Sequence, residues 1–185
     1  MKSLPTSLNS LLSRSSKEEE SFEYLFFWGH QENDPNGIFS QWYPSPFQDL
    51  DGIFYPTAEH FMMIGKAKVF NDVESLNAIF DTEDPRAAKK IGRQVRNFNP
   101  MVWNMVCRDI VSMGNFYKFT QNKDLLDKLL VTQGKILVEA SPYDSVWGIG
   151  MKSDEEGVLD PNNWKGTNYL GFVLTNLRDG LLSEA

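Results

Sequence analysis

TAEHFMMIGKAKVF, residues 57–70, has the residue spacing of a single α-helix around which the rest of the chain can pack. Thr57 is a favourable N-cap. On a helical wheel Glu59 and Lys66 fall within about 20° of each other and roughly 10 Å apart along the axis. The pattern predicts a helix that is buried nearly all round and carries two charges in its apolar stripe. Its apolar positions are Met62, Met63 and Phe70 beside the charges, and Phe61 and Ile64 on the opposite side.

The two charges, Glu59 and Lys66, have two interpretations. Burying a carboxylate or an ammonium costs on the order of several kcal/mol unless the group is paired or used, so both side chains could serve a reaction. The lysine side chain also leans toward the helix N-terminus, back toward Glu59. In the structural interpretation, Glu59 instead stabilises the positive N-terminal end of the helix, while Lys66 extends its ammonium to water. The helical wheel alone leaves both interpretations open.

Strands are predicted before this helix, and mostly helices after it. The aromatic run FEYLFFW at 22–28 is typical of a buried strand, and residues 47–55 read as a strand pair that turns at Asp51-Gly52. The fold class is therefore α+β, a mostly helical single domain with a small β-sheet. The later elements are a helix opened by Asp84-Pro85, a long helix from Asn99-Pro100 to about 119, a helix over 124–131, a strand over 136–140, a loop over 141–167 and a last helix over 166–181.

The predicted domain covers residues 22–183, and residues 1–21 are expected to form a poorly ordered tail. This N-terminal stretch is rich in serine and ends in the charge run Lys17-Glu18-Glu19-Glu20. A short helix around Leu11-Leu12 is the alternative.

Charge and composition exclude several classes of protein. The 185 residues contain 18 Lys and Arg against 25 Asp and Glu, a formal net charge of −7. This balance argues against sequence-independent binding to duplex DNA, which needs broad basic patches. One cysteine and two histidines argue against a disulfide framework or a structural zinc site. No apolar run is long enough to cross a bilayer, and the N-terminus lacks the apolar region of a secretory signal. We expect a cytoplasmic monomer, with the nucleus as the alternative location, that uses no metal or other cofactor.

A basic face is predicted on residues 86–96, RAAKKIGRQVR. Small and apolar residues fill the opposite side of the wheel. Such a face is ordinarily solvated. In the functional interpretation, one or two of its arginines bind a phosphate or diphosphate through forked hydrogen bonds. The basic residues are Arg86, Lys89, Lys90, Arg93 and Arg96.

Aromatic residues mark two further places. Trp103 lies in the predicted long helix, where a tryptophan belongs to the core more often than to a ligand site. Residues 143–150, YDSVWGIG, put Asp144, Trp147 and two glycines into one tight turn. An indole can stack on a base or sugar, and a carboxylate can accept hydrogen bonds from ribose hydroxyls. The long helix is expected to pack Met101, Met105, Val106, Ile110, Met113, Phe116 and Phe119 in the core.

These segments together resemble the YbiA-like, or NADAR, family. The resemblance runs from about Glu23 to the last predicted helix. Two positions depart from the family pattern, because Gln41 stands where the family usually has Asn, and Met62 stands where several members have Gln. The motifs that carry the resemblance are Gly37-Ile38-Phe39-Ser40, Tyr55-Pro56-Thr57-Ala58-Glu59-His60-Phe61, Lys66, Gly92-Arg93, Trp103, Asp144-Ser145-Val146-Trp147-Gly148 and Asn168-Tyr169-Leu170-Gly171.

The resemblance implies a hydrolase of N-glycosidic bonds in which Glu59 and Lys66 are catalytic. Family members are associated with removing ADP-ribose from guanine, and with cleaving ribosylamino-pyrimidine phosphates of riboflavin synthesis. Arg93 becomes the best candidate for a phosphate contact. The substrate-binding residues that the resemblance implies are Phe39, Ser40, Arg93, Trp103, Asp144, Trp147, Gly148 and Asn168.

Three functions follow as hypotheses. The first is cleavage of ADP-ribose from guanine, in a nucleoside or in single-stranded nucleic acid. The second is cleavage of riboflavin intermediates that carry a ribose 5′-phosphate. The third is a catalytically silent module that only binds ADP-ribose, against which the presence of both Glu59 and Lys66 argues. The expected partner is thus a small molecule containing ADP-ribose or ribose phosphate, or an ADP-ribosylated single strand, and no membrane.

Two chemical routes are compatible with these residues. Breaking a C1′–N bond builds oxocarbenium character on the ribose and negative charge on the departing base. A carboxylate such as Glu59 can stabilise the cation, position water or move a proton. A lysine kept neutral by burial, such as Lys66, can instead attack C1′ and form a Schiff base, with Glu59 as proton shuttle. The sequence does not choose between the two routes.

Overall fold

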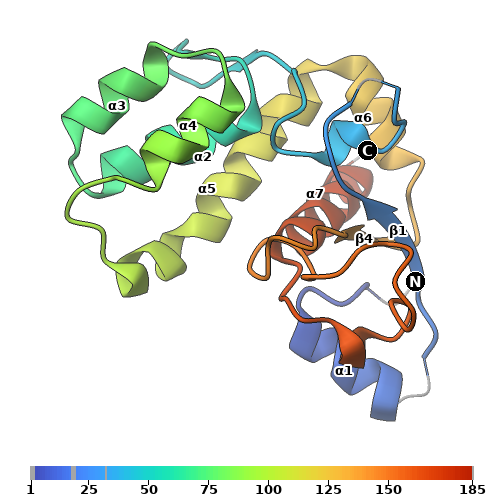
Figure 1. Cartoon of the computed structure of the whole chain (residues 1–185). Coiled ribbons are helices and arrows are strands. Elements are labelled where there is room, and N and C mark those ends of the chain that lie inside the picture. Colours follow the sequence, from blue (N-terminus) through green and yellow to red (C-terminus); the bar gives the residue numbers. More distant parts are fainter. Residues whose placement is uncertain (1–2, 18–19, 32, 185) are drawn as a thin grey trace. The chain divides into compact units, whose positions relative to one another are not determined.

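The computed structural model describes residues 3–17, 20–31 and 33–184 (Figure 1). These residues pack as two compact units. One, the strand unit, comprises the chain up to Gly29, residues 33–40 and the chain from Asp127 onward. The other, the helical unit, comprises residues 30–32 and 41–126. The chain passes back and forth between the units, so no single position in the sequence separates them. This explains why the sequence alone indicates one domain.

The strand unit is built on two parallel strands, β1 (Glu23–Phe27) and β4 (Lys135–Glu139), in which Leu25 lies opposite Leu137. Helix α7 (Tyr169–Glu184) packs against β4. The central residues of β4 are fully buried, as expected for a strand covered on both faces. The strands and the last helix predicted for this part of the chain are confirmed. The unit also contains α1 (Leu8–Lys17) and the short 3₁₀ helices η1 (Gly37–Phe39) and η2 (Pro161–Asn163).

Helix α1 differs from the tail expected for residues 1–21 and matches the alternative, a short helix around Leu11-Leu12. Its Leu11 is completely buried in a core that includes Ile136 and Phe172, and Leu8 packs against the same core. The two leucines are three positions apart, so a helix places them on one face although serines separate them. The stretch is polar in overall composition, but its helix has an apolar face that is buried in the tertiary structure. Residues 1–2 and 18–19 lie outside the described residues.

The helical unit begins with a hairpin, in which β2 (Phe47–Gln48) pairs antiparallel with β3 (Phe54–Tyr55). The Asp49 carboxylate accepts hydrogen bonds from the backbone N–H groups of Asp51 and Ile53, and Gly52 has a φ of +76°. The turn therefore forms at the predicted Asp51-Gly52. The helices that follow are α2 (Ala58–Val69), α3 (Val73–Phe80), α4 (Pro85–Gly92) and α5 (Pro100–Gln121), and α6 (Lys123–Leu130) carries the chain on into the strand unit.

The predicted helix starts in this unit are confirmed by their caps. Thr57, Asp84 and Asn99 each accept a hydrogen bond from a backbone N–H of the first turn of α2, α4 and α5. Helix α3 was not predicted from the sequence. A capping signal was present: Asp72 accepts hydrogen bonds from both the backbone N–H and the hydroxyl of Ser75.

The predicted fold class, α+β and mostly helical, is confirmed. The strands of the described residues form two separate two-stranded sheets. No helix in this part of the chain is long and apolar enough to span a membrane.

The core packing expected along α5 is wrong for several positions. Met101 and Met105 are 74% and 79% exposed, and Met113 and Phe116 are also exposed, whereas Phe119 is buried. A helix this long carries apolar residues on more than one face, so its spacing does not tell which face packs. The exposed residues at the start of α5 lie near Trp103, which is half-buried.

We predict opposite effects for the same substitution at two glycines of α7. A Cβ at Gly171 would overlap the carbonyl oxygen of Leu137 and the side-chain amide of Asn168. Gly171→Ala should therefore lower the free energy of unfolding by about 2–3 kcal/mol or more. Gly180 has open space around it, so Gly180→Ala should raise that free energy by up to ~1 kcal/mol through helix propensity. Urea unfolding measures both, and equal effects would contradict the packing described.

Candidate active site

Helix α2 is fixed at its start by a buried histidine. The Thr57 hydroxyl caps the helix and lies 2.8 Å from His60 Nδ1, and His60 Nε2 lies 3.1 Å from the carbonyl oxygen of Thr82. His60 is almost completely buried, and burial lowers its pKa. His60 thus joins the start of α2 to the segment that leads into α4.

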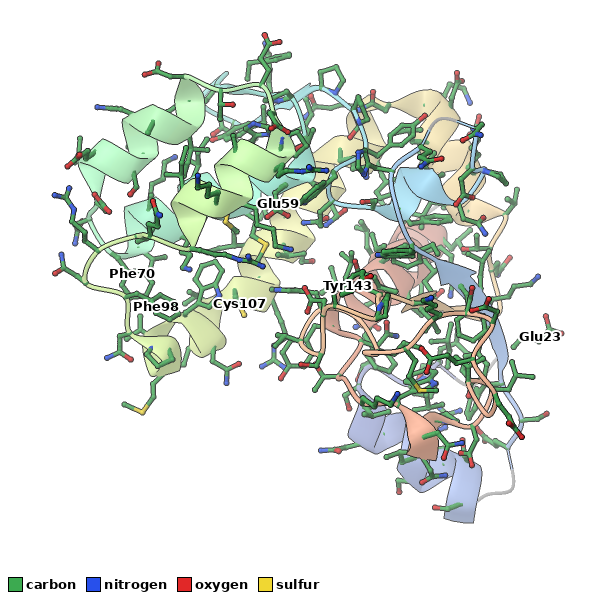
Figure 2. The ribbon with its side chains drawn as sticks, in the orientation of Figure 1. Glu23, Glu59, Phe70, Phe98, Cys107 and Tyr143 are labelled. Atoms are coloured by element: carbon green, nitrogen blue, oxygen red, sulfur yellow. The ribbon has the colours of Figure 1, made fainter. Side chains whose placement is uncertain are left out.

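Glu59 lies in the first turn of α2, and its side chain is buried, with only 4% of the residue exposed. Its backbone N–H donates a 2.9 Å hydrogen bond to the carbonyl oxygen of Gln41. The Gln41 side chain in turn accepts a 2.8 Å hydrogen bond from the amide of Asn115 on α5. Gln41, which departs from the family pattern, therefore connects the start of α2 to α5. Figure 2 labels Glu59 on this helix.

Lys66, two turns further along α2, is half-buried and held in place by the end of α4. Its Nζ donates a 2.7 Å hydrogen bond to the carbonyl oxygen of Gly92. The same Nζ lies 4.2 Å from the centre of the Phe98 ring and 5.8 Å from that of Trp103. Burial lowers the pKa of this amine, and the positive charge of Arg93 lowers it further. The result is an amine that loses its proton at lower pH than an ordinary lysine does, beside aromatic rings.

The segment that carries Arg93 and Phe98 is held by an ion pair that the sequence did not predict. Arg96 donates hydrogen bonds from Nε, from Nη2 and from its backbone N–H to the buried Asp72 carboxylate, at 3.0, 2.6 and 2.8 Å. These donors hold the pKa of the Asp72 carboxyl well below its usual range. Phe98 also packs edge-on against Phe70, with ring centres 5.2 Å apart (Figure 2).

The basic face of residues 86–96 is therefore not a uniform surface. Arg96 is engaged by Asp72 and also pairs with Glu74, although its side chain is 60% exposed. Arg93 is exposed and lies close enough to Lys66 to affect its pKa. Arg93 is thus the arginine of this face that lies close to the Lys66 amine.

The other predicted binding residues belong to the strand unit. The Asp144 carboxylate accepts hydrogen bonds from the backbone N–H groups of Val146 and Trp147, at 2.9 and 2.8 Å, and so builds the predicted tight turn. A Cβ at Gly148 would lie 2.8 Å from the carbonyl oxygen of Glu139, so only glycine fits there. Trp147 is half-buried and packs edge-on against Tyr169, with ring centres 5.9 Å apart.

Asn168 has a structural use. It is fully buried with a φ of +55°, its side chain accepts a hydrogen bond from the Glu139 N–H at 2.9 Å, and it donates one to the Leu137 carbonyl at 3.0 Å. The amide thus satisfies backbone groups of β4, as a neighbouring strand would. Phe39 is also buried and packs against the Phe27 ring, and the half-buried Ser40 follows at the end of η1.

The structure brings some of the predicted residues together. Lys66, Arg93 and Trp103 form one group in the helical unit. Phe98, which was not predicted, belongs to the same group, and Glu59 lies on the same helix as Lys66. Asp144, Trp147, Gly148 and Asn168 form a second group around the end of β4 in the strand unit. In the described residues, no three His, Cys, Asp or Glu side chains gather as a metal site would require.

Comparison with known proteins shows which family the chain resembles. The sequence model of the NADAR domain matches residues 26–182. The chain is 42% identical over 165 residues to an N-glycosidase of Acanthamoeba polyphaga mimivirus, covering 86% of this chain and 97% of that protein. It is 30% identical over 157 residues to a chloroplastic riboflavin biosynthesis protein of Zea mays, covering 79% of this chain and 23% of that protein. The NMR structure of the E. coli protein YbiA matches with a TM-score of 0.69 at 25% identity, covering 98% of this chain and 95% of the other.

We predict that Arg93→Ala raises the pKa of Lys66, because a nearby positive charge disfavours the ammonium form. The pH dependence of Lys66 acetylation by acetic anhydride, followed by peptide mass spectrometry, measures that pKa. Its midpoint should move to higher pH. Lys90→Ala removes a charge from an exposed position of α4 and is the control that should leave the midpoint in place. An unchanged midpoint in Arg93→Ala would show that Arg93 does not act on the amine.

Proposed function

The chain belongs to the NADAR domain family, and from that premise we propose that it is an N-glycosidase that removes ADP-ribose from guanine. The bond that breaks joins C1′ of the ribose to a nitrogen of the base, in a nucleoside or a single-stranded nucleic acid. The name of the mimivirus relative, 42% identical over nearly its whole length, supports the reaction class. The net charge of −7 supports a modified nucleotide, and not duplex DNA, as the substrate.

The observation that carries the proposal is the environment of the Lys66 amine. Its Nζ is half-buried, donates one hydrogen bond to the Gly92 carbonyl and has a pKa lowered by burial and by Arg93. An amine that gives up its proton more readily than an ordinary lysine is better suited to attack a carbon that carries oxocarbenium character.

The proposed reaction begins with attack by the Lys66 amine on the ribose. Lys66 Nζ forms a bond to C1′, and the C1′–N bond to guanine breaks with its electron pair going to the base, which takes a proton delivered through Glu59. The amine then loses a proton and the ribose ring opens at C1′–O4′, leaving a Schiff base on Lys66. Water adds to that carbon, the carbon–Nζ bond breaks, and the sugar leaves with a free anomeric centre.

Riboflavin intermediates are the second candidate substrate. The similarity to the maize riboflavin biosynthesis protein favours it. A single exposed arginine, Arg93, beside Lys66 also suits one ribose 5′-phosphate. The two candidates separate when the protein is incubated with ADP-ribosylated guanosine and with ribosylamino-pyrimidine phosphates. Chromatography then shows from which substrate a free base and a free sugar phosphate are released.

We predict that Glu59→Gln lowers turnover on the cleaved substrate by at least about 10²-fold, the usual scale for a lost acid–base group. The amide keeps the shape of the side chain but does not carry a proton between the base and water. Glu156→Gln, at an exposed carboxylate of the strand unit, is the control and should keep full turnover. Near-normal turnover in a folded Glu59→Gln protein would remove Glu59 from the mechanism.

We predict that Lys66 forms a covalent bond to the sugar during turnover. Borohydride added during turnover should reduce the Schiff base and leave a sugar adduct on Lys66 that peptide mass spectrometry can locate. Lys66→Arg should be inactive, because a guanidinium stays protonated and does not attack. Lys118 is the internal control: burial lowers its pKa to about 7, but its side chain is completely buried, so it should carry no adduct. An active Lys66→Arg protein without an adduct would leave direct attack by water.

A further inference from the structure

A cavity of about 450 Å³ opens in the helical unit where helices α2 and α4 begin. Trp42 and His30 supply its aromatic wall, and Thr57, Glu83, Asp84 and Arg86 supply polar atoms. The volume lies in the range of small-molecule sites, which combine an apolar wall with a few polar groups. The sequence singled out Thr57 in the 55–61 motif, Asp84 as a helix cap and Arg86 in the basic face, but not Trp42, His30 or Glu83.

Trp42 lies between an aromatic ring and a cation. The ring centres of Trp42 and His30 are 5.5 Å apart and inclined at 55°, and the Lys89 ammonium lies 5.7 Å from the centre of the Trp42 ring. A planar group that stacks in this aromatic part of the cavity therefore lies within reach of a cation on α4.

Helices α2 and α4 run side by side in the same direction, which connects the cavity to Lys66. Near their starts, His60 Nε2 meets the Thr82 carbonyl at 3.1 Å, and near their ends Lys66 Nζ donates to Gly92 at 2.7 Å. A Cβ at Gly92 would overlap the Met63 side chain, so the helices are in close contact. The length of α4 from Pro85 to Gly92 sets a separation of roughly 10 Å between the cavity and Lys66.

Charge changes sign along this path. Glu83 and Asp84 are exposed at the cavity end, before the first turn of α4. Arg86, Lys89 and Arg93 then follow at intervals of three and four residues, which places them in one stripe along the helix. Phosphate groups are therefore favoured along the helix and disfavoured at the carboxylates.

We propose that the cavity binds the nucleobase of a nucleoside diphosphate whose phosphates lie along Arg86, Lys89 and Arg93 and whose second sugar reaches Lys66. The base stacks on Trp42, and the Glu83 carboxylate accepts hydrogen bonds from an amino group of the base or from ribose hydroxyls. The placement of the second sugar rests on the proposed function. The cavity then selects an ADP-ribosyl substrate over one that carries only a ribose 5′-phosphate.

The test measures binding of ADP and of ribose 5-phosphate by titration calorimetry. Trp42→Ala should weaken ADP binding by at least about tenfold, the usual scale for a lost base–aromatic stack, and Trp42→Phe should weaken it less. Binding of ribose 5-phosphate should be unchanged in both variants. Arg86→Ala should weaken ADP binding, whereas Lys152→Ala, at an exposed position of the strand unit, should not. Trp42→Phe and Arg86→Ala keep the test valid if Trp42→Ala does not fold.

The proposal is overturned if the wild-type protein does not bind ADP, or if the Trp42 and Arg86 variants bind ADP as the wild type does. It is also overturned if the Trp42 variants lose ADP and ribose 5-phosphate equally. These outcomes are separate from the fate of the N-glycosidase function. A Lys66 adduct in a protein that does not bind ADP would support the N-glycosidase function and contradict the role of the cavity. ADP binding that depends on Trp42, without cleavage or an adduct, would support the role of the cavity and contradict the N-glycosidase function.

Discussion

The hydrogen bond from Lys66 Nζ to the carbonyl of Gly92 fixes the end of α2 against the end of α4, and the geometry of the helical unit follows from it. The absence of a side chain at Gly92 favours this close contact, since a Cβ there would overlap the Met63 side chain and force it to move. Once the helices are in contact, the ammonium leaves bulk water and Arg93 comes close to it. Both effects favour the neutral amine, so one packing constraint creates the chemical property that the proposed reaction uses.

A second constraint holds the aromatic side of this group. Phe98 follows Asn97, whose φ of +56° lies in the left-handed region that L side chains rarely adopt. Such a conformation persists only where the surroundings determine it. Here the Asp72–Arg96 ion pair holds the residue before Asn97, and the Phe70 ring packs against the residue after it. The ion pair costs little stability because Arg96 keeps its exposed side in water, while the buried Asp72 carboxylate has its hydrogen bonds satisfied.

Local signals predicted much of this fold. Caps at Thr57, Asp84 and Asn99 and the turn at Asp51-Gly52 depend on neighbouring residues only, and they form as expected. The group at Lys66 was predicted in part, because Glu59 and Lys66 share a helix face that can be read from spacing. Phe98, Asp72 and Trp42 were missed because the roles described for them come from pairs 12 or more residues apart, for which a single sequence carries no signal. The buried face of α1 was hidden for a related reason, since its leucines gain their partners from β4 and α7.

The surroundings of three buried or half-buried cations show why Lys66 stands apart. Arg178 is completely buried, but its guanidinium donates to the carbonyls of Thr132 and Lys135 and pairs with Asp179, so its charge is compensated as a structural cation requires. Lys118 is completely buried next to aromatic rings, and no substrate reaches it there. Lys66 combines a lowered pKa with partial exposure, and in the described residues its ammonium donates one hydrogen bond, to a neutral carbonyl. The Gly92 carbonyl and the Phe98 ring stabilise this ammonium while part of it stays accessible, which is the setting that the proposed reaction needs.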